Sequence, residues 1–309
     1  MKLMSVTLSE RYRGSLLGLA CGDALGATLE FSKRGTFEPI TNMNGGGPFD
    51  LLAGQWTDDT SMALCLAESL ICCKGFDAEH QMQMYVKWWK TGFLSATGKC
   101  FDIGVTTRRA LIAFEKNKQV FSGDINPRAA GNGSLMRLAP VVLFYYPNNE
   151  KVSEFSALSS MTTHAASEAV ECCRLFALIL ANALSGKSKE DVIQVDNVNL
   201  KEPRVLSLSS AWYRQKTYNE VSGTGYCVAS LEAALWCFYH TDSFEASILA
   251  AANLGDDADT TAAIVGQLAG AYYGIESIPK HWLSKLHMRD KIEDVARALY
   301  TFSRPVGHS

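Results

Sequence analysis

The chain has 309 residues, of which 47% are hydrophobic, and a formal net charge of -3. This length and composition suffice to bury a large core, in one large domain or two small ones. The balanced charge excludes the basic surface that nucleic acids and anionic membranes favour, so we expect small molecules or proteins as partners.

Cysteine usage and hydropathy indicate a cytoplasmic protein. The nine cysteines show no C-x-x-C spacing, which argues against a zinc site and a disulfide framework. Most of them lie in apolar helical patterns, as is typical of a reducing compartment. The apolar runs from Ser15 to Cys21 and from Leu175 to Leu184 are too short to span a bilayer. We therefore expect a cytoplasmic monomer with no membrane segment.

Apolar residues at helical spacing predict helices along most of the chain. The expected helices are Ser9 to about Ala24, the segment that follows Thr57, Asp77 to Lys90, the segment that follows Gly104, Thr162 to Ala183, Val228 to Tyr239, the segment that follows Asp259, and one or two between His281 and Phe302. Residues 185–220 are expected to form an exposed connection of irregular or short helical pieces. Residues 303–309 are expected to form a frayed tail. No useful strand alternation occurs, so residues 1–309 are expected to form one all-α domain of about ten or more helices.

Two of these helices begin with unusually many oxygen donors. Gln55 to Ser61 and Asn253 to Thr261 each place threonines and paired aspartates before an apolar helix. Carboxylates about 4 Å apart repel by roughly 1 to 4 kcal/mol, and a hard cation such as Mg²⁺, Mn²⁺ or Ca²⁺ relieves that repulsion. The pattern predicts that the two helix starts meet around a cation.

A plainer interpretation is that Asp59, Thr60, Asp259 and Thr260 only cap their helices, as Asp and Thr commonly do. One capping side chain per helix is enough, so the surplus of donors at both sites favours a metal. An EF-hand is excluded because Ala262 stands where that loop requires glycine.

Other polar residues are ambiguous by themselves. Glu30 reads as solvated surface when taken alone, and Asp102 fits either a helix cap or a carboxylate that faces a cleft. The segment from Gly131 to Arg137 can hold a phosphate on its amides or form a plain turn. His164 at a predicted helix start could bind phosphate or ribose or simply cap, and Tyr226 could stack on a base or be a buried tyrosine.

Taken together, these residues resemble the ADP-ribosylglycohydrolase family nearly from end to end. The resemblance rests on six ordered motifs: Gly22-Asp23-Ala24-Leu25-Gly26 with Glu30, Trp56-Thr57-Asp58-Asp59-Thr60, Asp102-Ile103-Gly104, Gly131-Asn132-Gly133-Ser134-Leu135-Met136-Arg137, Thr163-His164, and Gly255-Asp256-Asp257-Ala258-Asp259-Thr260.

The resemblance implies an all-α fold with a cleft that binds two Mg²⁺ or Mn²⁺ ions. The implied metal ligands are Thr57, Asp58, Asp59, Asp257, Asp259 and Thr260, with Asp256 as an outer candidate. The implied catalytic carboxylates are Glu30 and Asp102, and the residues expected around ADP-ribose are Asn132, Gly133, Ser134, His164 and Tyr226.

The implied reaction is hydrolysis of the bond between ADP-ribose and a modified protein side chain, with arginine as the favoured acceptor. Serine, a small metabolite, or ADP-ribose binding without turnover are the alternatives within the family. A prenyl-diphosphate synthase is disfavoured because Met62 stands where the third Asp of a D-D-x-x-D motif belongs.

Overall fold

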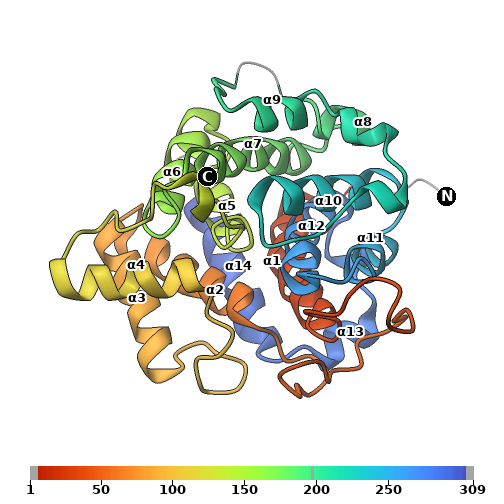
Figure 1. Ribbon diagram of the computed structural model, residues 1–309, viewed down its shortest axis with the longest axis horizontal. Coiled ribbons are helices and arrows are strands. Elements are labelled where there is room, and N and C mark those ends of the chain that lie inside the picture. The colour runs from red at the N-terminus through yellow and green to blue at the C-terminus, as the bar shows by residue number, and fades with distance from the viewer. Residues whose placement is uncertain (1–5, 196–197, 304–309) are drawn as a thin grey trace, which may run out of the picture.

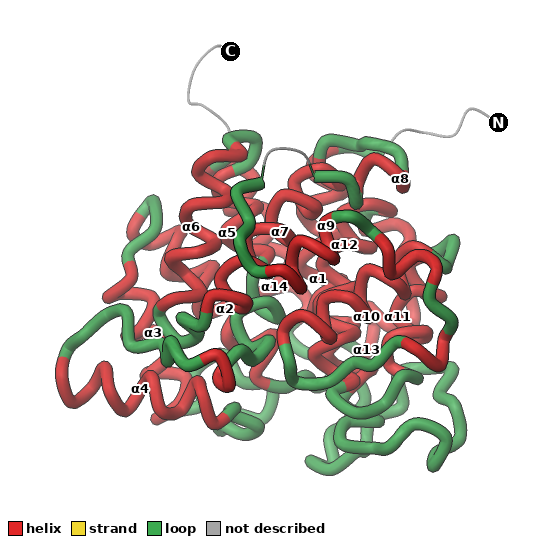
Figure 2. Tube along the Cα trace, turned by 45° about the horizontal axis from the view of Figure 1, so that its top comes forward, coloured by secondary structure: helices red, strands yellow, loops and turns green. Residues whose placement is uncertain are grey.

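The computed structural model describes residues 6–195 and 198–303. Within them the chain is built from helices and loops, and the β-pairing consists of isolated bridges (Figures 1 and 2). The all-α prediction is therefore confirmed. The helices are α1 (Leu8–Gly26), α2 (Asp58–Cys73), α3 (Ala78–Thr91), α4 (Val105–Asn117), α5 (Ala139–Tyr145), α6 (Asn149–Met161), α7 (Ser167–Leu184), α8 (Lys189–Val192), α9 (Pro203–Ser209), α10 (Cys227–Tyr239), α11 (Phe244–Ala252), α12 (Ala258–Tyr273), α13 (Lys280–Lys285) and α14 (Arg289–Phe302).

Helices α1 and α12 pack against each other at the centre of the fold (Figure 1). They run antiparallel, and small residues at every fourth position of each helix face one another. A methyl group built on Gly22 would come within 2.1 Å of the Ala262 carbonyl oxygen, so the two backbones are in direct contact. The facing pairs are Gly14 with Gly270, Gly18 with Gly266, Gly22 with Ala262, and Gly26 with Ala258.

This close packing places the end of α1 beside the start of α12. Helix α1 begins at a capping box formed by Thr7 and Glu10, and nearly all of its later residues are buried. Asp23, in its last turn, is fully buried although it is a carboxylate. The end of α1 therefore delivers a charged group to the same region as the start of α12.

The structure corrects one predicted helix boundary. Helix α7 begins at Ser167, whereas Thr162 and Thr163 form a turn that ends at His164. The reason is that His164 forms an isolated bridge with Asp124 and the Ala165 amide donates to the Asp124 carbonyl oxygen at 3.2 Å, which holds this backbone outside a helix.

The expected connection from 185 to 220 consists of α8, α9 and short 3₁₀ turns, as predicted. It is less exposed than expected because Val192, Val205, Leu208 and Tyr213 are buried against the core. The closing region forms two helices, α13 and α14, and residues 304–309 of the predicted tail lie outside the described part of the chain. In the described ranges, no helix is both long enough and apolar enough to cross a bilayer.

Candidate metal centre and substrate cavity

The two donor-rich helix starts meet, although they lie 202 positions apart in the chain. The Thr57 hydroxyl oxygen lies 3.2 Å from Asp259 Oδ2, and the Thr260 hydroxyl oxygen lies 3.4 Å from Asp59 Oδ2. Neither N-cap residue, Thr57 of α2 or Asp257 of α12, makes a side-chain capping bond to its own helix. The four residues of the plain capping interpretation are therefore not the N-caps, although Asp259 Oδ1 accepts from the adjacent Thr260 amide at 2.7 Å.

A buried carboxylate of α1 holds the start of α2. Asp23 Oδ1 accepts from the Thr57 amide at 2.8 Å and from its hydroxyl at 2.9 Å. Asp23 Oδ2 accepts from the Thr60 amide at 2.9 Å and from its hydroxyl at 2.6 Å. Asp23 has no separate role in the sequence prediction, because nothing in a single chain shows which helix start a distant carboxylate will hold.

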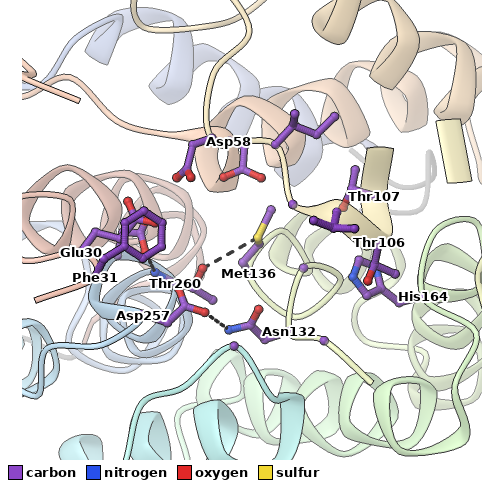
Figure 3. Close-up of a pocket in the computed structure, with 18 residues that line it drawn as sticks. Glu30, Phe31, Asp58, Thr106, Thr107, Asn132, Met136, His164, Asp257 and Thr260 are labelled. Carbon is purple, nitrogen blue, oxygen red and sulfur yellow. Dashed lines mark hydrogen bonds between the residues drawn. The ribbon is translucent and has the colours of Figure 1, made fainter. Parts of the chain in front are cut away.

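A cavity of about 360 Å³ opens above this junction (Figure 3). Among the described residues that line it there is no lysine and no arginine. Five carboxylates face it, namely Glu30, Asp58, Asp102, Asp257 and Asp259. Asp59 lies just beneath them and is 1% exposed. The cavity therefore concentrates negative charge with no fixed cation to balance it.

Burial and mutual repulsion raise the pKa values of these carboxyl groups. The pKa values of Asp58, Asp59 and Asp259 are well above the usual range, first because the groups are desolvated and then because neighbouring carboxylates repel their charge. The same two causes raise the pKa of Glu30. A protonated cluster or a bound cation are the two ways to satisfy such a site.

The donor set fits a hard divalent cation. One carboxylate oxygen each of Glu30, Asp102 and Asp259 lie within 4.8 Å of one another. Asp59 Oδ1 and Glu30 Oε2 are buried without a hydrogen-bond partner, and an unpartnered buried oxygen is costly unless something else satisfies it. Every candidate donor is an oxygen. Such a donor set suits Mg²⁺ or Mn²⁺ and not a soft metal that prefers thiolate ligands.

Asp102 is a loop carboxylate that faces the cavity and not a cap, because the N-cap of α4 is Gly104. Its backbone has a left-handed φ of 57°, which is uncommon for a residue with a side chain. Desolvation, followed by repulsion from Asp23 and Asp257, raises the pKa of Asp102 to about 7. A carboxyl group with that pKa can both hold and release a proton near neutral pH.

The opposite wall of the cavity is uncharged. Gly131, Asn132 and Gly133 line it together with His164 (Figure 3). A methyl group on Gly133 would come within 2.8 Å of His164 Cε1, so the missing side chain lets the imidazole reach the cavity. Asn132 links this wall to the acidic one, since its Nδ2 donates to Asp257 Oδ2 at 2.9 Å.

The loop from Gly131 to Arg137 is fixed from behind by α12. The buried Gln267 amide donates to the carbonyl oxygens of Leu135, at 3.1 Å, and Met136, at 2.8 Å, and its own oxygen accepts from the Ala139 amide at 2.7 Å. Helix α12 therefore supplies carboxylates at its start and positions the uncharged wall two and a half turns later. The sequence analysis did not single out Gln267.

His164 is held as a neutral ring. Burial, and then the positive charge of Arg137, lower the pKa of His164 to about 3. Arg137 Nη2 donates to the Thr163 hydroxyl oxygen at 2.6 Å, and the same hydroxyl lies 2.8 Å from His164 Nδ1. Arg137 can only donate, so the Thr163 hydroxyl is free to donate its own proton to His164 Nδ1. In that arrangement the ring proton is on Nε2, which is then an N–H donor near Gly131 and Gly133.

Thr57 and Asp59, both buried, do not line the cavity, and three further predicted residues lie outside it. Ser134 is buried and accepts from the Ser160 hydroxyl at 2.8 Å. The Tyr226 hydroxyl donates to Glu168 Oε2 at 2.6 Å in a neighbouring hollow, although the preceding Gly225 lines the cavity itself. Asp256 does not line the cavity either, and its backbone bonds to the segment that follows Glu30.

The fold and the site define an all-α protein whose cavity gathers carboxylates beside an uncharged wall. The model of the family described as ADP-ribosylglycohydrolase matches residues 4–307. The chain belongs to this family, which confirms the resemblance and the prediction of a hydrolase that acts on ADP-ribosyl groups.

Individual relatives agree with the family. The chain is 43% identical over 291 residues to "ADP-ribosylarginine hydrolase Tri1" of Pseudomonas putida (strain GB-1), a match that covers 94% of this chain and 78% of that protein. It is 30% identical to "ADP-ribosyl-[dinitrogen reductase] glycohydrolase" of Rhodospirillum rubrum, with 92% of each chain covered. A solved structure described as an "ADP-ribosylglycohydrolase-related protein complex" has a TM-score of 0.86 and 41% identity, over 96% of this chain and 99% of that one.

Proposed function

We propose that this protein is a metal-dependent ADP-ribosylarginine hydrolase, a cytoplasmic, single-domain monomer that releases ADP-ribose from modified arginine side chains of proteins. The observation that carries the proposal is a cavity with five carboxylates on one wall and a neutral glycine, asparagine and histidine wall opposite. The arginine linkage is favoured over serine because the relative that is 43% identical is named an ADP-ribosylarginine hydrolase.

Two Mg²⁺ or Mn²⁺ ions are proposed to bind between the two helix starts. Their ligands would be Thr57, Asp58, Asp59, Asp257, Asp259 and Thr260. When bound, such cations would neutralise the carboxylates, bind ribose hydroxyl groups and polarise a water molecule. Asp23 would keep Thr57 and Thr60 in place by the four hydrogen bonds that it accepts from them.

Glu30 and Asp102 are the proposed proton carriers. Both face the cavity and lie beside the proposed metal ligands without belonging to them. An arginine side chain leaves more easily when its guanidino group is protonated, so a carboxyl group that gives up a proton near neutral pH assists departure. A carboxylate that then takes a proton from water would complete the hydrolysis.

The neutral wall is proposed to bind the rest of ADP-ribose. The lack of a side chain on Gly131 and Gly133 lets a diphosphate approach the backbone closely, and the amide of Gly133 is the proposed donor to it, because the amides of Gly131 and Asn132 already donate to the carbonyl oxygens of Ala129, at 2.8 Å, and Gly225, at 3.1 Å. The N–H of His164 is the second donor on that wall. Asn132 holds Asp257 and the wall at a fixed separation through its bond of 2.9 Å.

Release of ADP-ribose tests this proposal. The purified protein is incubated with an ADP-ribosylated arginine peptide and with a serine-linked peptide, each with Mg²⁺, with Mn²⁺ and with chelator. We expect release from the arginine peptide that stops with chelator. Release from the serine peptide alone would overturn the linkage, and binding of ADP-ribose with no release from either would favour a non-catalytic reader of the same fold.

A further inference from the structure

Phe31 lies at the mouth of the cavity with its ring in solvent. It follows Glu30 directly and lines the cavity, yet its side chain is 69% exposed. Large apolar side chains at the entrance of a polar site are candidates for binding whatever passes through that entrance. Nothing in the catalytic scheme above uses this ring.

The backbone of Phe31 is held in an unfavourable conformation. Its φ is 59°, which is a genuine outlier for a bulky residue. The Phe31 amide donates to the Asp256 carbonyl oxygen at 2.7 Å, and the Asp256 amide donates to the Ser32 carbonyl oxygen at 2.8 Å. Asp256 itself has a φ of 56°. Two reciprocal hydrogen bonds thus hold the strained segment that carries the ring, a pattern typical of functional positions.

Phe31 belongs to a row of three aromatic rings that extends away from the cavity lining. Its ring centroid is 6.3 Å from that of Phe49, which lies 5.3 Å from that of Phe101. Both pairs meet edge to face, which fixes the rings in the orientation that aromatic pairs prefer. Phe101 precedes Asp102, so the row joins the two loops that carry the proposed proton carriers.

The ring lies on the side of the cavity away from the neutral wall. In Figure 3, Glu30 and Phe31 lie at one end and His164 at the other, with Asp58, Asp257 and Asn132 between them. If the neutral wall holds the diphosphate and the carboxylates surround the reacting ribose, the group attached to that ribose leaves the cavity past Phe31.

We propose that Phe31 binds the guanidinium group of the modified arginine and is a specificity-determining residue for a cationic acceptor. This inference rests on the proposed function. A guanidinium ion stacks on an aromatic face through the negative charge of the ring centre. A serine oxygen is neutral, so it gains nothing from such a contact.

The test compares Phe31→Leu, which keeps apolar bulk and removes the aromatic face, with Phe31→Trp, which strengthens it. Phe302→Leu is the matched control, because Phe302 is 40% exposed and belongs to α14, outside the cavity lining. Two quantities are measured with Mg²⁺: kcat/KM for an ADP-ribosylarginine peptide and, by calorimetry, the affinity for free ADP-ribose. Thermal unfolding shows that each variant is folded.

We expect Phe31→Leu to lower kcat/KM by roughly 2- to 30-fold, the range that a cation–π contact of ~0.5–2 kcal/mol provides. Phe31→Trp should keep or raise it, and the affinity for free ADP-ribose should be the same in all variants. Equal kcat/KM for Phe31→Leu and Phe302→Leu would overturn the inference and leave the hydrolase intact. Weaker binding of free ADP-ribose by Phe31→Leu would also overturn it, because the ring would then contact the nucleotide. Absence of release by the unchanged protein would instead contradict the proposed function.

Discussion

The starts of α2 and α12 look alike in the sequence but are held in place by different means. At α2, one buried carboxylate, Asp23, accepts four hydrogen bonds from the two threonines. At α12, the Asp257 amide donates to the Gly223 carbonyl oxygen at 2.9 Å, and its carboxylate accepts from Asn132. The start of α2 is therefore held by one side chain of α1, whereas the start of α12 packs directly on the α1 backbone at Gly26 and is also bonded to Gly223 and Asn132. The difference teaches that the start of α2 depends on a single buried carboxylate, while the start of α12 has several supports.

The largest effect is expected when a proposed ligand is removed from either start. Asp59→Asn and Asp257→Asn keep the shape of the side chain and remove its charge, so each should lower metal-dependent kcat/KM by more than about 100-fold, beyond what loss of an outer partner costs. Circular dichroism should show unchanged helix content. Asp294→Asn, on the exposed face of α14, is the control and should match the unchanged protein. Full activity in either variant would show that the helix start carrying the substitution does not supply a metal ligand.

The two residues that hold the helix starts, Asp23 at α2 and Asn132 at α12, should differ in how much metal affinity is lost when each is replaced. Asp23→Asn leaves donors of Thr57 or Thr60 without an acceptor, whereas Asn132→Ala removes a single bond to Asp257. We expect metal affinity, measured by calorimetry with Mn²⁺, to fall by about 100-fold in the first and about 10-fold in the second, the two ends of the range for groups that support ligands. The reverse order would show that metal affinity depends more on the bond from Asn132 at α12 than on Asp23 at α2.

The charge of the cluster predicts how stability depends on pH. The pKa of Asp102 is raised to about 7 from an ordinary value near 3.8, so its proton stabilises the folded state at low pH and this contribution is lost as pH rises through 7. Without metal, the melting temperature should therefore fall between pH 5 and pH 8. Excess Mg²⁺ at pH 8 should raise it by about 5 °C, and by less at pH 5. A chelated protein that is equally stable at both pH values would contradict the assigned repulsion.

The smallest effect is expected at Tyr226. Its hydroxyl is engaged by Glu168 at 2.6 Å and by Arg204 at 3.2 Å, outside the cavity lining. Tyr226→Phe removes those two bonds and keeps the ring, so kcat/KM should change by less than about threefold while the free energy of unfolding drops by about 1 kcal/mol. A large loss of activity would place the hydroxyl on the substrate in the working enzyme.

Much of the fold could be predicted from helical periodicity, because long apolar stripes such as those of α7 and α10 leave few alternatives. The arrangement of the helices was harder. The spacing of Gly14, Gly18, Gly22 and Gly26 was present in the sequence as a signal for close helix packing, but its partner helix could not be chosen without the matching small residues of α12. The boundary of α7 was missed because the bridge between Asp124 and His164 is a long-range contact.

The candidate site was predictable where residue type alone limits the chemistry. Clustered Asp and Thr at two helix starts imply a cation wherever the helices lie, and the structure brings them together. Residues that act by supporting others were not predictable in this way. Asp23 and Gln267 are ordinary polar residues in the sequence, and only their buried partners give them a role. Side-chain direction was equally hidden, as the outward tyrosine at 226 and the buried Ser134 show.

The most direct test is a titration of the metal-free protein with Mn²⁺ up to saturation. The electron paramagnetic resonance spectrum of the bound Mn²⁺ is recorded at each step. If the starts of α2 and α12 form one site, the protein should bind two ions whose signals are coupled because they lie close together. Asp59→Asn and Asp257→Asn should each abolish that coupling. Two isolated ions, or a coupled pair that survives both substitutions, would show that the two helix starts do not share a metal centre.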